Sequence, residues 1–188
     1  CGIGDTKRAR MLLNQGADIH AEDENGPDAA LRYAARNGHT ETVKLLLDQG
    51  AIIDAEDDWG PAGALRLAAE NGHSETVELL LDHGSDIHSL NDAALGWAAR
   101  AGRTETVKVL LDRGADIHAK DEAALKEAAK NKQTKTVGLL LEKYTLEELK
   151  KLRDNRPEEA LPAVENEIKT RRIKAIVNTQ KKDSGMTI

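Results

Sequence analysis

Aromatic residues are scarce in this 188-residue chain, which has no phenylalanine and an aromatic fraction of only 2%. Aromatic side chains supply much of the bulk of globular cores, so this core must be built from Ala, Leu, Val and Ile, in thin helical layers.

Cys1 is the single cysteine, which excludes an intrachain disulfide and fits a reducing compartment, so we expect a cytoplasmic protein. No apolar run is long enough to cross a membrane, and no membrane partner is expected.

Positive charge is in deficit, because 27 Lys and Arg face 33 Asp and Glu for a net charge of −6. An acidic chain has no general affinity for nucleic acid, so no nucleic-acid partner is expected. Residues 1–144 hold 17 basic and 25 acidic residues, net −8, whereas residues 145–188 hold 10 and 8, net +2. The last part of the chain therefore differs in character from the rest.

The most informative feature that is present is a repeat. The phrase Leu-Leu-Asp-x-Gly-Ala/Ser-Asp-Ile-His returns with small changes, at spacings of 34, 34 and 30 residues, around Gly16, Gly50, Gly84 and Gly114. A fixed period outranks local signals, because it sets the architecture and the stabilising contacts together.

Each repeat holds two apolar patterns with helical spacing. In the first, Ala and Leu recur three and four residues apart around Leu31, Leu65, Leu95 and Leu125. The second is Val-x-x-Leu-Leu, which begins at Val43, Val77, Val107 and Val137. Glycines that suit a left-handed residue end the first helix at Gly38, Gly72 and Gly102. The hydroxyl residues that follow are expected to be N-caps of the second helix: Thr40, Ser74, Thr104 and Thr134.

Two short helices joined by extended connectors cannot bury their apolar face alone, so stacking of units must complete the core. In its phrases Leu-x-x-Ala-Ala-x-x-Gly-His and Val-x-Leu-Leu-Leu-x-x-Gly-Ala-Asp-Ile, the chain resembles the ankyrin-repeat family over residues 1–144. The resemblance implies an all-α fold, an ankyrin-type solenoid of helix-turn-helix units. The family's Thr-Pro-Leu-His opening keeps only its leucine here. We therefore expect Asp28, Asp92 and either Asp121 or Glu122 to help cap the first helices instead.

Boundaries follow from the alignment of the repeats. We expect the array to consist of a partial first repeat at 1–23 and units at about 24–57, 58–90, 91–120 and 121–144. Cys1 aligns with a helical position of the repeat, so we expect further residues upstream, with a lipidated terminus as the alternative.

The repeat pattern ends at Tyr144, which stands where the next glycine would be. Thr145-Leu146-Glu147-Glu148 is a capping box. Residues 145–180 are interpreted as a helical cap over the open end of the array, followed by a flexible tail at 181–188. A self-association helix in this segment is the alternative, and would make a homodimer of the expected monomer. The basic run 169–174 is interpreted as a solvated helix face, with a nuclear-import or nucleic-acid patch as its alternative.

Histidines raise the question of a metal site. His20, His88 and His118 occupy the same position in different repeats. Packed helices lie about 8–10 Å apart, whereas each ligand lies about 2 Å from its metal, so these residues cannot share one ion. His39 and His73 stand at the turn where the family that the chain resembles has a structural histidine. No metal is expected.

Catalytic motifs are missing from the sequence. There is no phosphate-binding glycine loop, His-Glu-x-x-His or Cys-x-x-Cys pattern. Neither Cys1 nor a serine in a nucleophile-elbow setting offers covalent catalysis. The acidic residues recur in connectors instead of forming an isolated pair. We therefore expect no catalytic residue, no cofactor and no enzyme activity in this segment.

The resemblance implies a recognition surface made of connector tips and the exposed side of the first helices. In the longer connectors a tryptophan, a residue enriched at binding hot spots, lies among acids; the candidates there are Glu24, Glu56, Asp57, Asp58 and Trp59. On the first-helix side the candidates are Arg32, Arg36, Arg66, Glu70, Asn71, Arg100 and Lys130. The alternatives are a merely solvated acidic stretch and packing of the tryptophan on the next connector. Tyr33 and Trp97 align with Leu67 and are interpreted mainly as core.

The leading interpretation is a non-enzymatic protein–protein interaction module, or scaffold, that binds a protein or peptide. One alternative is the recognition half of a larger enzyme or of a secreted effector, whose catalytic domain would lie upstream. The Asp-Ile-His phrase is similar to ankyrin arrays of intracellular bacteria and large viruses, which would place such an effector in a host cytosol. The other alternative is a structural protein that self-associates through its C-terminal helices.

Overall fold

The computed structural model describes residues 2–21, 28–53, 63–155 and 161–183. In these ranges the chain is all-helical, with no strand. The helices are α1 (Gly2–Asn14), α2 (Ala29–Arg36), α3 (Thr40–Asp48), α4 (Gly63–Asn71), α5 (Ser74–Asp82), α6 (Ser89–Arg100), α7 (Thr104–Asp112), α8 (Ala119–Lys130), α9 (Thr134–Lys143), α10 (Leu146–Asn155) and α11 (Leu161–Asp183). The candidate connector residues Glu24, Glu56, Asp57, Asp58 and Trp59 lie outside the described residues.

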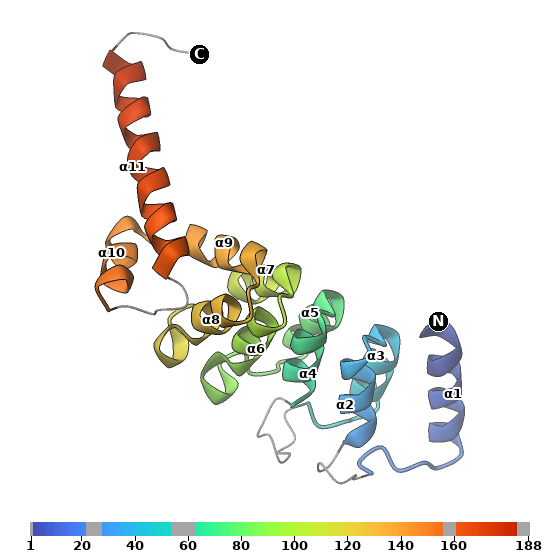
Figure 1. Cartoon of the computed structure of the whole chain (residues 1–188). Helices are drawn as coiled ribbons and strands as arrows, with labels where there is room; N and C mark the ends of the chain where they lie inside the picture. The colour runs from blue at the N-terminus through green and yellow to red at the C-terminus, as the bar shows by residue number, and fades with distance from the viewer. Residues whose placement is uncertain (1, 22–27, 54–62, 156–160, 184–188) are drawn as a thin grey trace.

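The helices stack as a solenoid of two rows (Figure 1). The first helices α2, α4, α6 and α8 form one row, and the second helices α3, α5, α7 and α9 form the other. Helix α1 packs on α3, in the row of second helices. The core is one continuous cluster, and each unit contributes the aliphatic residues that the repeat predicted, with the leucines of the first helices at Leu31, Leu65, Leu95 and Leu125. The predicted all-α helical solenoid is confirmed.

Three first helices, α2, α4 and α6, are followed by a glycine over which a side chain of the next repeat lies. Gly38 has a φ of +69°, and a Cβ at this position would lie 2.4 Å from the imidazole of His73. Nε2 of His73 is 3.0 Å from the carbonyl oxygen of Arg36, so the ring joins consecutive repeats. The same arrangement recurs in the pairs Arg103–Gly72 and Gln133–Gly102.

The hydroxyl residues at the start of the second helices do not cap them, so the N-cap prediction is wrong. Helices α3, α5 and α7 begin at these residues and have no side-chain cap bond. The hydroxyls instead bridge neighbouring second helices at 2.8–2.9 Å, in the pairs Thr6–Thr42, Thr40–Thr76, Ser74–Thr106 and Thr104–Thr136. Helix α9, which begins at Thr134, likewise has no side-chain cap bond. Each of these hydroxyls thus bonds to a hydroxyl of the adjacent helix instead of to a backbone N–H in the first turn of its own helix.

The carboxylates expected to cap the first helices join connectors instead. Asp28 stands at the N-cap of α2 but makes no cap bond. Its Oδ1 lies 3.2 Å from Nδ1 of His20 in the connector before it, and accepts the N–H of Ile52 in the connector after it at 3.1 Å. The capping prediction is therefore wrong for Asp28, because the carboxylate turns away from its own helix.

Asp92 repeats this arrangement 64 residues further along. Its Oδ1 lies 3.1 Å from Nδ1 of His88 and accepts the N–H of Asp116 at 2.8 Å. Asp121 pairs with Lys126 at 2.5 Å, so it is not a cap either. These contacts explain the Asp-Ile-His phrase: the Asp accepts the N–H of the His at 2.9 Å, which orients the ring toward the next carboxylate.

The connectors after Gly84 and Gly114 are four residues shorter than the earlier ones, and each contains a left-handed turn. Three consecutive residues have positive φ at the start of α6, in Leu90–Asp92, and again at the start of α8, in Lys120–Glu122. Left-handed conformation costs a non-glycine residue roughly 1–2 kcal/mol, and among these residues Asn and Asp tolerate it best. The hydrogen bonds of Asp92 hold this turn against its conformational cost.

Two further helices, called the cap below, pack at the C-terminal end of the array. Helices α10 and α11 pack on each other, and α11 contacts α9, burying Leu149, Leu152, Val164 and Ile168. Arg171 donates from Nη2 to the carbonyl oxygen of Leu141 at 2.5 Å and from Nη1 to that of Tyr144, so it caps the end of α9. Beyond this contact α11 projects away from the array (Figure 1). No helix in the described part of the chain combines the length and the apolar character needed to span a membrane.

Candidate protein-interaction surface

One row of side chains runs along the outer side of the first helices. It consists of equivalent residues, each two positions after the core leucine of its helix: Tyr33, Leu67, Trp97 and Glu127. Two positions correspond to about 200° around a helix, so this row faces away from the core. Tyr33 is 68% exposed, and Leu67 and Trp97 are half-buried. The interpretation of Tyr33 as core is therefore wrong, and helical geometry was the signal that could have shown it.

Trp97 is flanked by two of the candidate arginines. The guanidinium carbon of Arg66 lies 5.6 Å from the centroid of the Trp97 ring, and that of Arg100 lies 5.0 Å away. Cations at this distance from an indole are attracted by its π-electrons. The arginines and the tryptophan therefore form one surface unit, which the core interpretation of Trp97 missed.

The other first-helix candidates differ in accessibility. Arg36, Arg100 and Lys130 are exposed. Glu70 is half-buried and pairs with Arg66 at 3.4 Å, and Asn71 donates to the carbonyl oxygen of Leu67 at 2.8 Å to cap the end of α4. Arg32 is only 6% exposed, so its expected place on the exposed face is wrong. Arg32 packs among the repeats instead of facing a partner.

A groove of about 230 Å³ lies beside Trp97, between α6 and α8. Small side chains form much of its wall: Ala93 and Gly96 of α6, and Ala119 and Ala123 of α8. Gly96 explains the groove, because the equivalent positions of the other repeats hold long cationic side chains at Arg32, Arg66 and Lys126. A Cβ added at Gly96 would meet no atom within 4 Å, so the space is open.

Charge is divided between the two rows of helices. In the first helices, after their opening turns, the charged residues are Arg32, Arg36, Arg66, Arg100, Lys126 and Lys130 against Glu70 and Glu127. In α3, α5 and α7 they are mainly acidic, with Lys44 and Lys108 against Glu41, Asp48, Glu75, Glu78, Asp82, Glu105 and Asp112. Arg32 is buried, but the other residues of this set still include more cations than anions. Beyond their opening turns, the first helices thus form a cationic face on an acidic protein.

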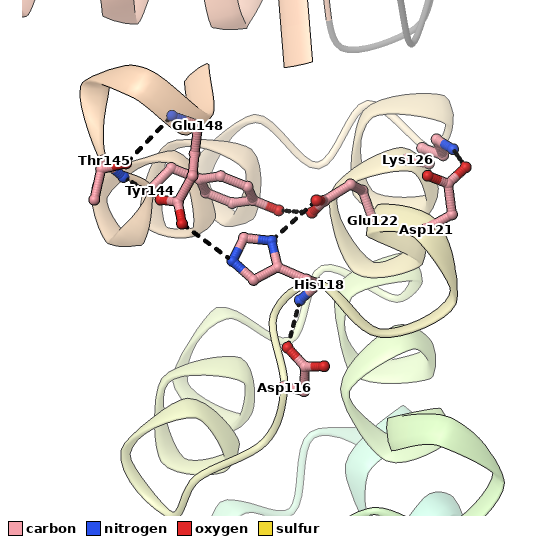
Figure 2. A network of polar contacts seen from close by, with 8 residues as sticks. All are labelled: Asp116, His118, Asp121, Glu122, Lys126, Tyr144, Thr145 and Glu148. Carbon is pink, nitrogen blue, oxygen red and sulfur yellow. Dashed lines mark hydrogen bonds and ion pairs between the residues drawn. The ribbon is translucent and has the colours of Figure 1, made fainter. Parts of the chain in front are cut away.

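A second polar cluster joins the last repeat to the cap (Figure 2). Nδ1 of His118 lies 2.9 Å from Oε1 of Glu122, and its Nε2 lies 3.6 Å from a carboxylate oxygen of Glu148. The hydroxyl of Tyr144 donates to the other oxygen of Glu122. The His118 and Tyr144 rings meet edge to face, with centroids 5.1 Å apart. Glu122 is thus held in the same way as Asp28 and Asp92, between a connector histidine and a hydrogen-bond donor. In Glu122 the donor is the Tyr144 phenol, whereas in Asp28 and Asp92 it is a backbone N–H of the next connector.

Two pKa values are shifted in this cluster. Burial raises the pKa of the Tyr144 phenol above its ordinary value of 10.0, and the hydrogen bond with Glu122 raises it further. The backbone N–H of Thr145 holds the pKa of Glu148 below its ordinary value of 4.5. The reciprocal bonds between Thr145 and Glu148, at 2.6 and 3.2 Å, confirm the predicted capping box. These interactions fasten α10 to the array.

The connector residues His20, His88 and His118 are thus each engaged by a carboxylate at the start of the next first helix. Within the described ranges, no group of three or more His, Cys, Asp or Glu side chains is arranged to hold a metal ion. The geometry of His20, His88 and His118 is that of three separate hydrogen-bonded pairs, each at a different connector.

Comparison with known protein families agrees with this architecture. The family pattern described as "Ankyrin repeats (3 copies)" matches residues 1–91 and again residues 65–151. A comparison with curated proteins finds none that matches. Ankyrin repeats are generally protein–protein interaction modules and are typically non-catalytic. Since the matches, the two-row solenoid and the recurring turn glycines agree, the chain belongs to the ankyrin-repeat family.

Proposed function

We propose that this chain is a non-enzymatic interaction module that binds a protein partner across its first-helix side. The contact surface is centred on Tyr33, Leu67 and Trp97, with Arg36 and Arg100 at its border. The observation that carries the proposal is the exposure of Tyr33, at 68%, in the same row as Trp97. Tyr, Trp and Arg are the residues most enriched among binding hot spots.

The acidic connector residues extend the proposed surface. Trp59 and its acidic neighbours stand in the connector that leads into α4, and Glu24 stands in the one that leads into α2. A cationic helix face beside acidic connectors favours a partner of mixed charge. Such complementarity increases the association rate and the specificity more than the affinity itself.

The test is site-specific photo-crosslinking in a native lysate. A photoreactive phenylalanine derivative at position 33 is expected to capture a defined protein, whereas the same group at Glu78, an exposed residue of the second-helix row, is not. The captured species is then identified by mass spectrometry, and its binding is measured with purified proteins. Capture only from position 78, or equal capture from both positions, would place the contact elsewhere.

A further inference from the structure

We infer that the groove beside Trp97 takes one aliphatic side chain from an extended, acidic segment of the partner protein. This inference rests on the proposed function, because it specifies what the first-helix side binds. The groove is walled by alanines, Gly96 and the Trp97 ring. Its charged residues are Asp92, Asp116, Glu127, Arg100 and Lys120, so the apolar wall has a polar border.

The size of the groove favours a single side chain. Its volume of about 230 Å³ lies below the roughly 300–1,000 Å³ typical of small-molecule sites. An apolar side chain inserted in a small pocket and surrounded by polar contacts is the usual form of a hot spot between proteins. An aliphatic side chain fits the alanine walls and can lie against the Trp97 ring.

The carboxylates at the groove are already engaged by the protein itself. Asp92 is buried and accepts the N–H of Asp116. Glu127 lies 3.8 Å from Arg100 and accepts from Asn131 at 3.4 Å. Asp116, the third carboxylate, accepts the N–H of His118 at 2.9 Å. All three carboxylates at the groove are therefore hydrogen-bonded within the protein.

The cationic face gives the direction and the charge of the bound segment. From the groove, the row of first helices leads over α4 to α2, where Arg36 is exposed. Arg100 is also exposed, and its guanidinium carbon lies 5.0 Å from the centroid of the Trp97 ring at the groove. An extended segment that leaves the groove toward α2 therefore passes arginines, which favour Asp and Glu in that segment.

Gly96 allows a test in which stability and binding change in opposite directions. Gly96→Arg restores the cationic residue that the other repeats have and fills the groove. Glycine disfavours a helix interior relative to arginine, so this variant should melt about 2–4 °C higher. Its affinity for a segment seated in the groove should nevertheless fall at least about tenfold. Gly96→Ala, which occupies little of the groove, should gain the stability and keep most of the affinity.

The experiment uses a display library of random linear peptides, selected on the full chain and screened against Gly96→Arg. The enriched peptides are expected to share an aliphatic residue with Asp or Glu on one side. Replacing that aliphatic residue with alanine should weaken binding to the wild-type chain and leave the weak binding to Gly96→Arg unchanged. Amide chemical shifts in α6 and α8 should change on binding.

Four results would overturn the inference: no enriched peptide, enriched peptides that are basic, peptides that bind wild type and Gly96→Arg equally, or crosslinking of the native partner at position 33 that Gly96→Arg leaves unchanged. The proposed function fails separately. If Gly96→Arg leaves crosslinking of the native partner at position 33 unchanged, the partner uses the face but not the groove. If position 33 captures nothing, the face itself is not the contact.

Discussion

The carboxylate of Asp92 accepts a hydrogen bond from the backbone N–H of Asp116, which lies in the next connector, at 2.8 Å. The same relationship joins Asp28 to Ile52, and Glu122 to the hydroxyl of Tyr144. Each carboxylate also faces a histidine of the preceding connector. The connectors of this array are thus held by side chains that start its first helices.

Removing the Asp92 carboxylate should destabilise the array. Asp92→Ala leaves the N–H of Asp116 without its acceptor, and a lost buried partner costs about 1–3 kcal/mol. Asp92→Asn keeps an oxygen acceptor and tolerates the left-handed backbone, so its loss should be smaller. Urea unfolding followed by circular dichroism measures both. Asp48→Ala, at an exposed helix end, is the control and should change stability by no more than about 0.5 kcal/mol. An equal loss in the control would deny Asp92 this role.

Alanine at two turn glycines should separate backbone strain from collision. Gly38 and Gly50 both have positive φ, +69° and +98°, so alanine at either position should lower the free energy of unfolding by roughly 1–2 kcal/mol. A Cβ at Gly50 meets no atom within 4 Å, whereas a Cβ at Gly38 meets the His73 ring at 2.4 Å. Gly38→Ala should therefore cost about 1–3 kcal/mol more. Thermal unfolding measures the difference, which should largely vanish when His73→Ala is also present. A difference that persists would mean that another contact is responsible.

The Tyr144 phenol should make stability fall at alkaline pH. Its pKa in the folded protein is raised above the ordinary 10.0 by burial. A raised pKa means that the stabilisation is complete below pH 10 and is lost as the pH rises beyond it, because the unfolded chain ionises first. Tyr144→Phe should flatten this dependence and cost about 1–3 kcal/mol at neutral pH, since Glu122 loses a donor. Denaturant unfolding at several pH values measures both effects. An unchanged alkaline slope in the variant would assign the loss to other groups.

The capping box should weaken in acid. The pKa of Glu148 is lowered by the backbone N–H of Thr145, and that of Glu147 by its hydrogen bond with Lys150. Lowered pKa values mean that this stabilisation is present above the ordinary 4.5 and is lost as the pH falls below it. The protection factors of the α10 amides, which are exchange rates corrected for the intrinsic slowing of exchange in acid, should therefore fall below pH 4.5. Thr145→Ala should cost about 0.5–2 kcal/mol and make exchange fast at neutral pH too. Exchange in α5 is the internal reference, and a parallel change there would indicate global unfolding instead.

The sequence predicts those features that depend on local periodicity. Spacing of Leu31 and Val43 within their helices predicts both the helices and their buried faces, and Thr145 with Glu148 predicts a capping box. The prediction from sequence fails where a side chain can hydrogen-bond either to its own helix or to a neighbouring repeat. Thr40 and Asp28 are good N-cap residue types, yet both bond across the repeat boundary. No local pattern distinguishes these outcomes, because the competing partner is more than 20 residues away.

The proposed contact surface could be predicted only in part from the sequence. Arg36 and Arg100 were placed correctly on the exposed side, but Arg32 is buried. The alignment of Tyr33 with Leu67 predicts a core position, although a place two residues after Leu31 turns the side chain outward. The groove at Gly96 follows from comparing that position with Arg66 and Lys126, and it needed the spatial neighbourhood of α8 to become visible.

Tyr144 occupies the position at which every earlier repeat turns into a connector. Its ring fills the end of the last repeat, and its hydroxyl satisfies the acceptor that would otherwise await another unit. The series of hydrogen bonds from each first-helix carboxylate to the next connector therefore ends at Tyr144. Replacing Tyr144 with Gly-Ala-Asp-Ile-His would restore the repeat phrase at this position. Further designed repeats could then be inserted between the last repeat and the cap.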